Sequence, residues 1–191
     1  LGATKSISEI ICQNFQKSSS YYSDIKIVRF GNVFGSKGSA IELFVDQLNK
    51  QLPVTLTDYS VKRYFMSIRE ACNLVIQSTN LTNKGKIFIL NMGKQILMRD
   101  IIFKLAEMKN IGKEEVLIKK IGLNKGEKLS EELSIGKQFI KTSNKDIFET
   151  NEPTYKKERI EKLIYDLKKN IFHKNQHFLK KIIFSFLLKE K

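Results

Sequence analysis

The chain has 191 residues, 41% of them hydrophobic, which is enough to build a core and argues against wholesale disorder. The net charge is +14, but only five of the 34 basic residues are arginine. Proteins that bind nucleic acids usually contact it through arginine side chains with aromatic residues between them, so we expect no nucleic-acid partner. No run of about 18 apolar residues predicts a membrane span, and two scattered cysteines predict neither a disulfide framework nor a metal site and favour a cytoplasmic setting.

The first predicted elements alternate helices with short apolar strands. Apolar side chains at helical spacing predict a helix over residues 3–15, and a β-branched run predicts a buried strand over 25–30. The loop that follows this strand holds three glycines in eight positions, which allows unusual backbone dihedral angles. A helix is predicted over 41–48, and two short strands are predicted over 53–57 and 63–66.

The same alternation continues along the chain. A buried strand is predicted over 87–90, a helix over 98–108 whose apolar stripe ends at Met108, and a strand over 116–118. The helix predicted over 69–77 is expected to turn four side chains inward: Ala71, Leu74, Val75 and Ser78. Helices that alternate with short apolar strands indicate an α/β fold.

The last forty residues differ from the rest in charge and pattern. Residues 152–191 hold eleven basic and five acidic side chains, and amphipathic helices are predicted over 159–170 and 178–189. We therefore divide the chain into a main part, 1–150, and a basic helical tail, 151–191. The tail either packs on the core or on a partner subunit, or it forms a basic amphipathic surface drawn to anionic lipid.

Three groups of residues are candidates for chemistry on their own. Lys5 lies near the start of the first helix, where a lone lysine is ordinarily a solvated surface group. The glycine-rich loop follows a strand, where ligands collect in open α/β sheets, and Asn32 could bind a phosphate there, although the loop is not a Walker A motif. Gly126 and Glu127 belong to a segment that is also typical of a helix start.

Taken in order, five motifs resemble a known family. They are LGATK at 1–5, RFGNVFGSKGS at 29–39, RYFM at 63–66, LNMG at 90–93 and GLNKGEKLSEEL at 122–133. This order is similar to the C-terminal part of CapD-like polysaccharide biosynthesis proteins, the UDP-N-acetylglucosamine 4,6-dehydratases of the extended short-chain dehydrogenase/reductase superfamily. The resemblance covers about residues 1–150 and implies a Rossmann-type α/β fold with a small sugar-nucleotide-binding domain.

The resemblance implies NAD or NADP as cofactor and assigns residues to it. Lys5 matches the lysine of the family's Tyr-x-x-x-Lys motif, which binds the nicotinamide ribose and lowers the pKa of the tyrosine. Leu1 stands at the tyrosine position, so it cannot be the base. Phe30 and Val33 match positions that flank the nicotinamide.

The resemblance also implies a UDP-N-acetyl-sugar as substrate. Glu127 matches the acid of the family's Arg-Pro-Gly-Glu-Lys motif, in which Lys125 replaces one diphosphate contact and Arg63 supplies another. The six residues assigned to the substrate are Asn32, Ser39, Thr55, Arg63, Lys125 and Glu127.

No Gly-x-Gly-x-x-Gly motif occurs in the sequence, and the family's acid–base pair would precede residue 1. We therefore expect a truncated 4,6-dehydratase that is inactive as this chain alone, with an exposed sheet edge that makes it poorly soluble. Two alternatives stay open: a UDP-sugar 4-epimerase of the same superfamily, and a non-catalytic sugar-nucleotide-binding or assembly module completed by a separate N-terminal half. A homo-oligomer, or such a missing half, is the expected protein partner.

Overall fold

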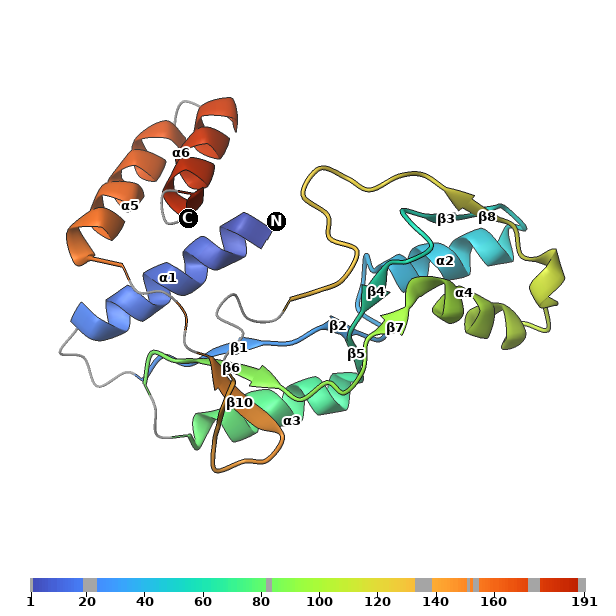
Figure 1. Ribbon diagram of the computed structural model, residues 1–191, viewed down its shortest axis with the longest axis horizontal. Helices are drawn as coiled ribbons and strands as arrows, with labels where there is room; N and C mark the ends of the chain where they lie inside the picture. Colours follow the sequence, from blue (N-terminus) through green and yellow to red (C-terminus); the bar gives the residue numbers. More distant parts are fainter. Residues whose placement is uncertain are drawn as a thin grey trace.

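The computed structural model describes residues 2–18, 24–81, 84–132, 139–150, 152, 155–171 and 176–188 (Figure 1). The α-helices are α1 (Gly2–Ser18), α2 (Ala40–Asn49), α3 (Ile68–Thr79), α4 (Met98–Glu107), α5 (Lys157–Ile171) and α6 (Gln176–Leu188), and a 3-10 helix spans Lys113–Glu115. The strands are β1 (Ile27–Arg29), β2 (Asn32–Val33), β3 (Val54–Leu56), β4 (Lys62–Arg63), β5 (Phe65–Met66), β6 (Ile87–Leu90), β7 (Ile96–Leu97), β8 (Ile118–Lys120), β9 (Phe139–Lys141) and β10 (Ile147–Thr150). The six helices predicted over 3–15, 41–48, 69–77, 98–108, 159–170 and 178–189 are confirmed within three residues at each end.

A four-stranded sheet in the order β1-β6-β10-β9 organises one half of the molecule. Strand β1 pairs parallel with β6, and β10 pairs antiparallel with both β6 and β9. Figure 1 shows α1 and α3 on opposite sides of β1 and β6. Leu74 of α3 packs in one buried cluster with Phe88 of β6 and Ile147 of the neighbouring strand β10.

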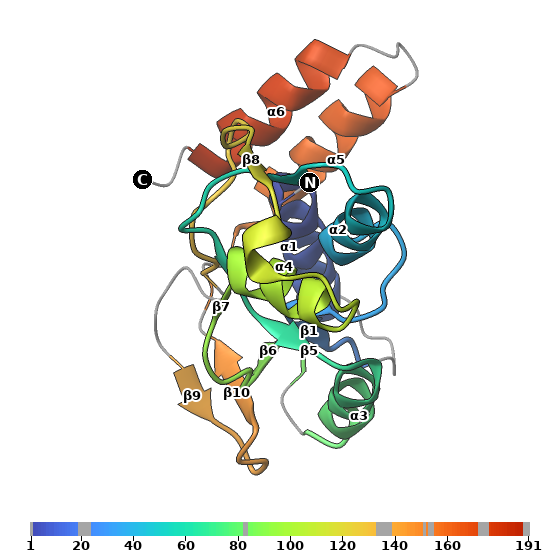
Figure 2. The same ribbon diagram turned by 90° about the vertical axis from the view of Figure 1, so that its right-hand side faces the viewer.

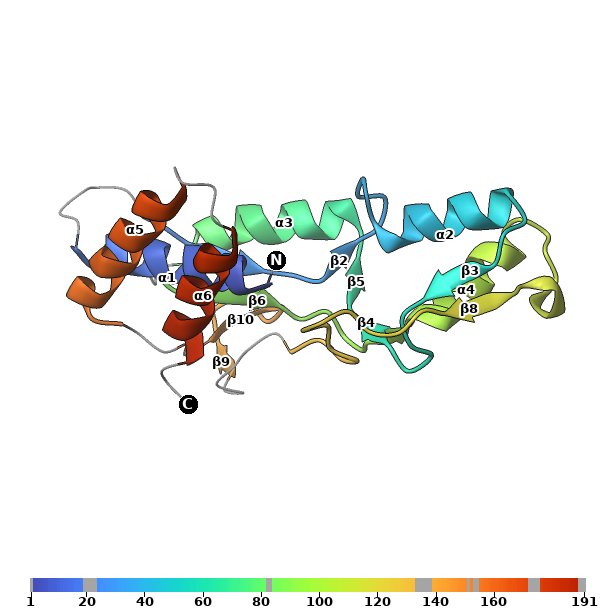
Figure 3. The same cartoon turned by 90° about the horizontal axis from the view of Figure 1, so that it is seen from above.

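The other half of the molecule has its own core. Helices α2 and α4 pack on strands β3 and β8, which pair in parallel. The core side chains include Phe44, Leu48, Val54 and Ile102, all nearly or fully buried. Figure 3 shows the two halves along the long axis of the molecule, with β2, β4 and β5 between them. The chain crosses between the halves several times, so both must form for these middle strands to be placed.

The two tail helices pack on α1. Ile160 and Leu163 of α5 and Phe186 of α6 form one buried cluster with Ile7 and Ile10 of α1. Figure 2 shows α5 and α6 at one end of the molecule with α1 beneath them. Packing of the tail on the core, one of the two arrangements expected from the sequence, is therefore found in the structure.

Three details of the predicted elements are wrong. Val75 and Met108 are exposed, because α3 buries only a narrow face and α4 ends at Glu107, before Met108. No helix begins between Gly126 and Glu132; a turn and an isolated bridge stand there. The strand predicted over 63–66 is broken at Tyr64, where the chain leaves one two-stranded ladder for another.

Candidate functional site

Three short segments meet where the two halves of the molecule join. Strand β4 pairs antiparallel with β7, and its other side meets the chain near residue 130, where Lys62 forms an isolated bridge with Ser130. The backbone N–H of Lys62 donates to the carbonyl of Leu129 at 2.8 Å. This pairing holds the segment after residue 126 beside β4. Arg63, which follows Lys62, therefore lies against that segment.

Arg63 and Glu127, both assigned to the substrate by the family resemblance, contact each other at this place. The guanidinium of Arg63 lies 3.3 Å from Oε1 of Glu127 and 3.7 Å from Oε1 of Glu131. It also donates to the carbonyl oxygens of Lys62 and Leu129. The two carboxylate contacts are longer than a tight charge-assisted hydrogen bond, so the guanidinium keeps capacity to donate to a further anion.

The carboxylate of Glu127 is held by donors from two segments. Thr57 donates its hydroxyl to Oε1 at 2.9 Å, and Asn124 donates its backbone and side-chain N–H to Oε2 at 3.1 and 3.2 Å. Burial acts to raise the pKa of Glu127, but these hydrogen bonds and the charge of Arg63 hold it below its ordinary value. The stability that this lowered pKa brings is present above the pKa of the unfolded chain, and it is lost only as the pH falls through the folded value. Glu127 is therefore an anionic acceptor at neutral pH.

Sequence reasoning missed Thr57, Asn124 and Glu131. Thr57 lies directly after β3, and no pattern in the sequence points its hydroxyl at Glu127. Asn124 closes a turn with Glu127, in which the backbone N–H of Glu127 donates to its carbonyl at 2.9 Å. The turn chemistry of asparagine and Gly126 was a signal for Asn124.

Three other residues that were predicted to bind the substrate make their described contacts away from Arg63 and Glu127. Thr55 in β3 exchanges hydrogen bonds with Gln47 of α2. Ser39 caps α2 and accepts from the backbone N–H of Glu42 at 3.3 Å. Lys125 is exposed in the turn before Glu127 and makes no ion pair with any residue that the structure describes. Their assignment to the substrate stays a prediction.

Asn32 and the predicted cofactor residues lie at the carboxyl end of β1. Phe30 follows the strand directly and is exposed, and Asn32 and Val33 form β2, which pairs with β5. Figure 1 shows the start of α1, which carries Lys5, above this end of β1. Leu1, at the family's tyrosine position, lies outside the described residues.

One ion-pair cluster fixes α1 over β1. Arg29 binds both carboxylate oxygens of Glu9 at 2.8 and 2.7 Å and one oxygen of Glu152 at 2.7 Å. Burial acts to lower the pKa of Arg29, but Glu9 and Glu152 outweigh it and raise the pKa. Glu9 is one helical turn after Lys5, so this clamp holds Lys5 toward the carboxyl end of β1. The residues present thus fit a nicotinamide ribose at this edge.

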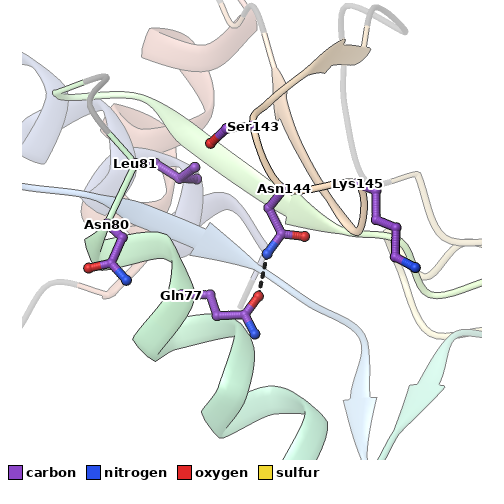
Figure 4. A pocket seen from close by; sticks show the side chains of 6 residues that line it. All are labelled: Gln77, Asn80, Leu81, Ser143, Asn144 and Lys145. Atoms are coloured by element: carbon purple, nitrogen blue, oxygen red, sulfur yellow. Dashed lines mark hydrogen bonds between the residues drawn. The ribbon is translucent and has the colours of Figure 1, made fainter.

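An open pocket of about 420 Å³ lies elsewhere, between the end of α3 and the turn that joins β9 to β10 (Figure 4). Asn144 donates its side-chain N–H to the side-chain carbonyl of Gln77 there. None of the residues predicted to bind substrate or cofactor lines this pocket; its lining consists of Gln77, Asn80, Leu81, Ser143, Asn144 and Lys145.

None of the described helices is long and apolar enough to cross a membrane. Within the described ranges no three His, Cys, Asp or Glu side chains gather as metal ligands do.

Relatives place these features in a family. The chain is 42% identical over 133 residues to the capsular polysaccharide biosynthesis protein CapD of Staphylococcus aureus, which covers 70% of this chain and 22% of CapD. It is 36% identical over 189 residues to the uncharacterized membrane protein MJ1061 of Methanocaldococcus jannaschii, across 96% of this chain and 56% of that protein. This second match extends into the tail.

Solved structures agree with the sequence relatives. The structure of Pen from Bacillus thuringiensis is 34% identical with a TM-score of 0.70, over 81% of this chain and 49% of that one. Structures of sugar-nucleotide dehydratases and epimerases, 18–23% identical with TM-scores of 0.52–0.58, show the shared fold alone. UDP-glucose 4-epimerases of Rickettsia species are 28–31% identical over about 60% of the chain.

The chain spans about half of the Pen chain and less than a quarter of CapD. The profile of a family described as polysaccharide biosynthesis protein matches residues 1–152. The chain therefore belongs to the polysaccharide biosynthesis protein family and has the Rossmann-type fold of the extended short-chain dehydrogenases/reductases.

Proposed function

We propose that this chain forms the substrate side of an NAD- or NADP-dependent UDP-N-acetylglucosamine 4,6-dehydratase that acts in surface polysaccharide synthesis. In this proposal an upstream half supplies the pyrophosphate loop, because the sequence holds no Gly-x-Gly-x-x-Gly motif. The reaction belongs in the cytoplasm, the reducing compartment that the two free cysteines favour.

The observation that carries the proposal is the Arg63–Glu127 cluster. It offers a guanidinium with spare donors next to a carboxylate that stays ionised, and these two groups suit a diphosphate and a ribose diol respectively. The ion pair between the two groups is loose, with 3.3 Å between the guanidinium and Oε1 of Glu127, so a ligand could take over part of it. A cluster of this kind recognises the nucleotide half of a UDP-sugar and leaves the hexose to the residues that precede it along the chain.

At the cofactor edge the proposal assigns Lys5 to the nicotinamide ribose, with Phe30 and Val33 beside the ring. The chemistry that a bound nicotinamide supplies is the removal of a hydride from the sugar and the later return of that hydride to the sugar. The contribution of this chain is to orient: Arg29 fixes the helix that carries Lys5, and Asn32 presents an exposed amide to the substrate diphosphate.

The alternative is a UDP-sugar 4-epimerase, which the similarity to the Rickettsia epimerases favours. Both enzymes remove hydride from the same carbon, so the substrate cluster does not separate them. A binding or assembly module completed by a separate half would retain the cluster and lack the reaction. A homo-oligomer of the completed protein is part of the same proposal.

Replacement of Arg63 by lysine should weaken the binding of UDP-N-acetylglucosamine to the purified chain about tenfold, the equivalent of one charge-assisted hydrogen bond. Lysine keeps the charge but loses the planar fork that can serve a phosphate and Glu127 together. Isothermal titration calorimetry measures this affinity. The matched control is Arg99→Lys, because Arg99 is exposed on α4 and lies 3.6 Å from the neighbouring Asp100. Equal affinity of both variants and the parent chain would remove Arg63 from the site.

The same chain incubated with NAD and UDP-N-acetylglucosamine should release no 4-keto sugar and show no nicotinamide absorbance after desalting. The expected reason is that no residues for the cofactor pyrophosphate are present in the sequence. Proton NMR of the sugar products measures the outcome. A 4-keto product would establish the dehydratase and overturn the need for an upstream half, whereas a sugar inverted at C4 would establish the epimerase.

A further inference from the structure

Helix α6 carries large apolar side chains on both of its faces. Its inner face packs on α1 and α5 through Phe186 and its neighbours. On its outer face three large apolar side chains are partly exposed, Phe178 at 44%, Phe184 at 53% and Leu188 at 59%. Large apolar side chains usually lie in a core or against lipid, and among the described residues the core cluster covers only the inner face of α6.

The charges on α6 have a single sign. Lys180 and Lys181 are exposed, and the described helix holds no aspartate or glutamate. Lys181 is three residues from both Phe178 and Phe184, so it lies on the same outer face. Aromatic and aliphatic side chains together with lysines are the composition of a helix that lies in the interface of an anionic bilayer.

Length and charge decide between possible partners of this face. At about 1.5 Å per residue, the 13 residues of α6 extend about 20 Å, which is short of the roughly 30 Å hydrocarbon core. The helix can therefore lie on a bilayer but cannot span it. A second copy of the same face would set lysines against lysines in a symmetric contact, which like-charge repulsion opposes.

We propose that the outer face of α6 docks the protein on an anionic lipid bilayer, with Phe178, Phe184 and Leu188 in the interface and Lys180 and Lys181 at the headgroups. Helix α5 and the inner face of α6 remain packed on α1, so the four-stranded sheet and the Arg63–Glu127 cluster stay in the aqueous phase. Figure 2 shows α6 at the outer end of the molecule, where a flat surface can reach it.

The chain contains no tryptophan, so one introduced indole reports on its surroundings without background. The Phe184→Trp variant is mixed with vesicles of phosphatidylcholine containing about one third phosphatidylglycerol, and with vesicles of phosphatidylcholine alone. We expect its emission to shift to the blue on the anionic vesicles only. The matched control is Tyr59→Trp, an exposed aromatic between β3 and β4, which Figure 1 shows far from α6; its emission should not move.

Two changes separate the charged from the apolar contribution. Lys180→Glu with Lys181→Glu should weaken partitioning at least about tenfold, and physiological salt should weaken it too. Phe178→Ser with Leu188→Ser should abolish the shift while circular dichroism shows an unchanged fold, because both side chains are exposed. Three outcomes overturn the proposal: no shift on anionic vesicles at low salt, an equal shift on neutral vesicles, or a concentration-dependent shift without vesicles, which indicates self-association.

Discussion

Replacement of Arg29 by methionine should lower the free energy of unfolding by about 2–4 kcal/mol, because it leaves two carboxylates without their shared cation. Glu9 and Glu152 approach Arg29 from α1 and from the segment after β10, and the side chain of Glu152 is only 4% exposed. Removing one charged member of a nearly buried cluster lowers the free energy of unfolding by more than the intact cluster adds to it, because the remaining charges stay desolvated. Urea unfolding followed by circular dichroism measures the change through the midpoint.

The matched control for this variant is Arg99→Met. Arg99 is about half exposed and pairs with Asp100 at 3.6 Å, so its loss should change the unfolding free energy by less than about 0.5 kcal/mol. Adding Glu152→Gln to Arg29→Met should restore part of the stability, because a neutral amide removes one desolvated charge. Equal midpoints for the Arg29 and Arg99 variants would show that the cluster is not a clamp.

The fold was predictable where its cause is local. The long helices follow from apolar residues at helical spacing, and α2 and α3 begin at serines, Ser39 and Ser67, whose side chains accept from the first turn. The strands β2 and β7 are two residues long each and carry no pattern of their own. They exist because a partner strand lies beside them, which a single sequence does not reveal.

The candidate site divides in the same way. The resemblance selected Arg63 and Glu127, and the structure brings them together. It did not select Thr57, because a contact between that hydroxyl and Glu127 depends on where two distant segments cross. Val75 shows a different failure: the helical pattern gave the right element and the right face, since Ala71, Leu74 and Ser78 are buried, but the buried face is too narrow to include Val75.

The glycine-rich loop shows how one motif combines two physical causes. Gly35 and Gly38 adopt φ values of 77° and 70°, the left-handed conformation that the run of glycines suggested. Gly31 is required for a different reason. A Cβ atom added at Gly31 would lie 2.6 Å from the Cβ atom and 2.7 Å from the carbonyl oxygen of Tyr64. The first glycine of the motif therefore permits the close approach of two strands.

Replacement of Gly31 by alanine should therefore lower the free energy of unfolding by about 3 kcal/mol, the upper range for an overpacked site. The clash is with backbone atoms of Tyr64, which no side-chain rotation relieves. The backbone N–H of Asn32 donates to that same carbonyl at 2.8 Å, so relief of the clash breaks the start of the β2–β5 ladder. Urea unfolding measures the loss.

The matched control is Gly2→Ala, because a Cβ atom at Gly2 meets nothing within 4 Å and alanine favours a helix. Its stability should equal or slightly exceed that of the parent chain. Gly31→Ala should also weaken the binding of UDP-N-acetylglucosamine in calorimetry at low temperature, where the variant stays folded, because Tyr64 follows Arg63 directly and its displacement moves the guanidinium. Unchanged stability and unchanged binding in Gly31→Ala would contradict the close approach of Gly31 to Tyr64, and loss of stability with full binding would separate this glycine from the site.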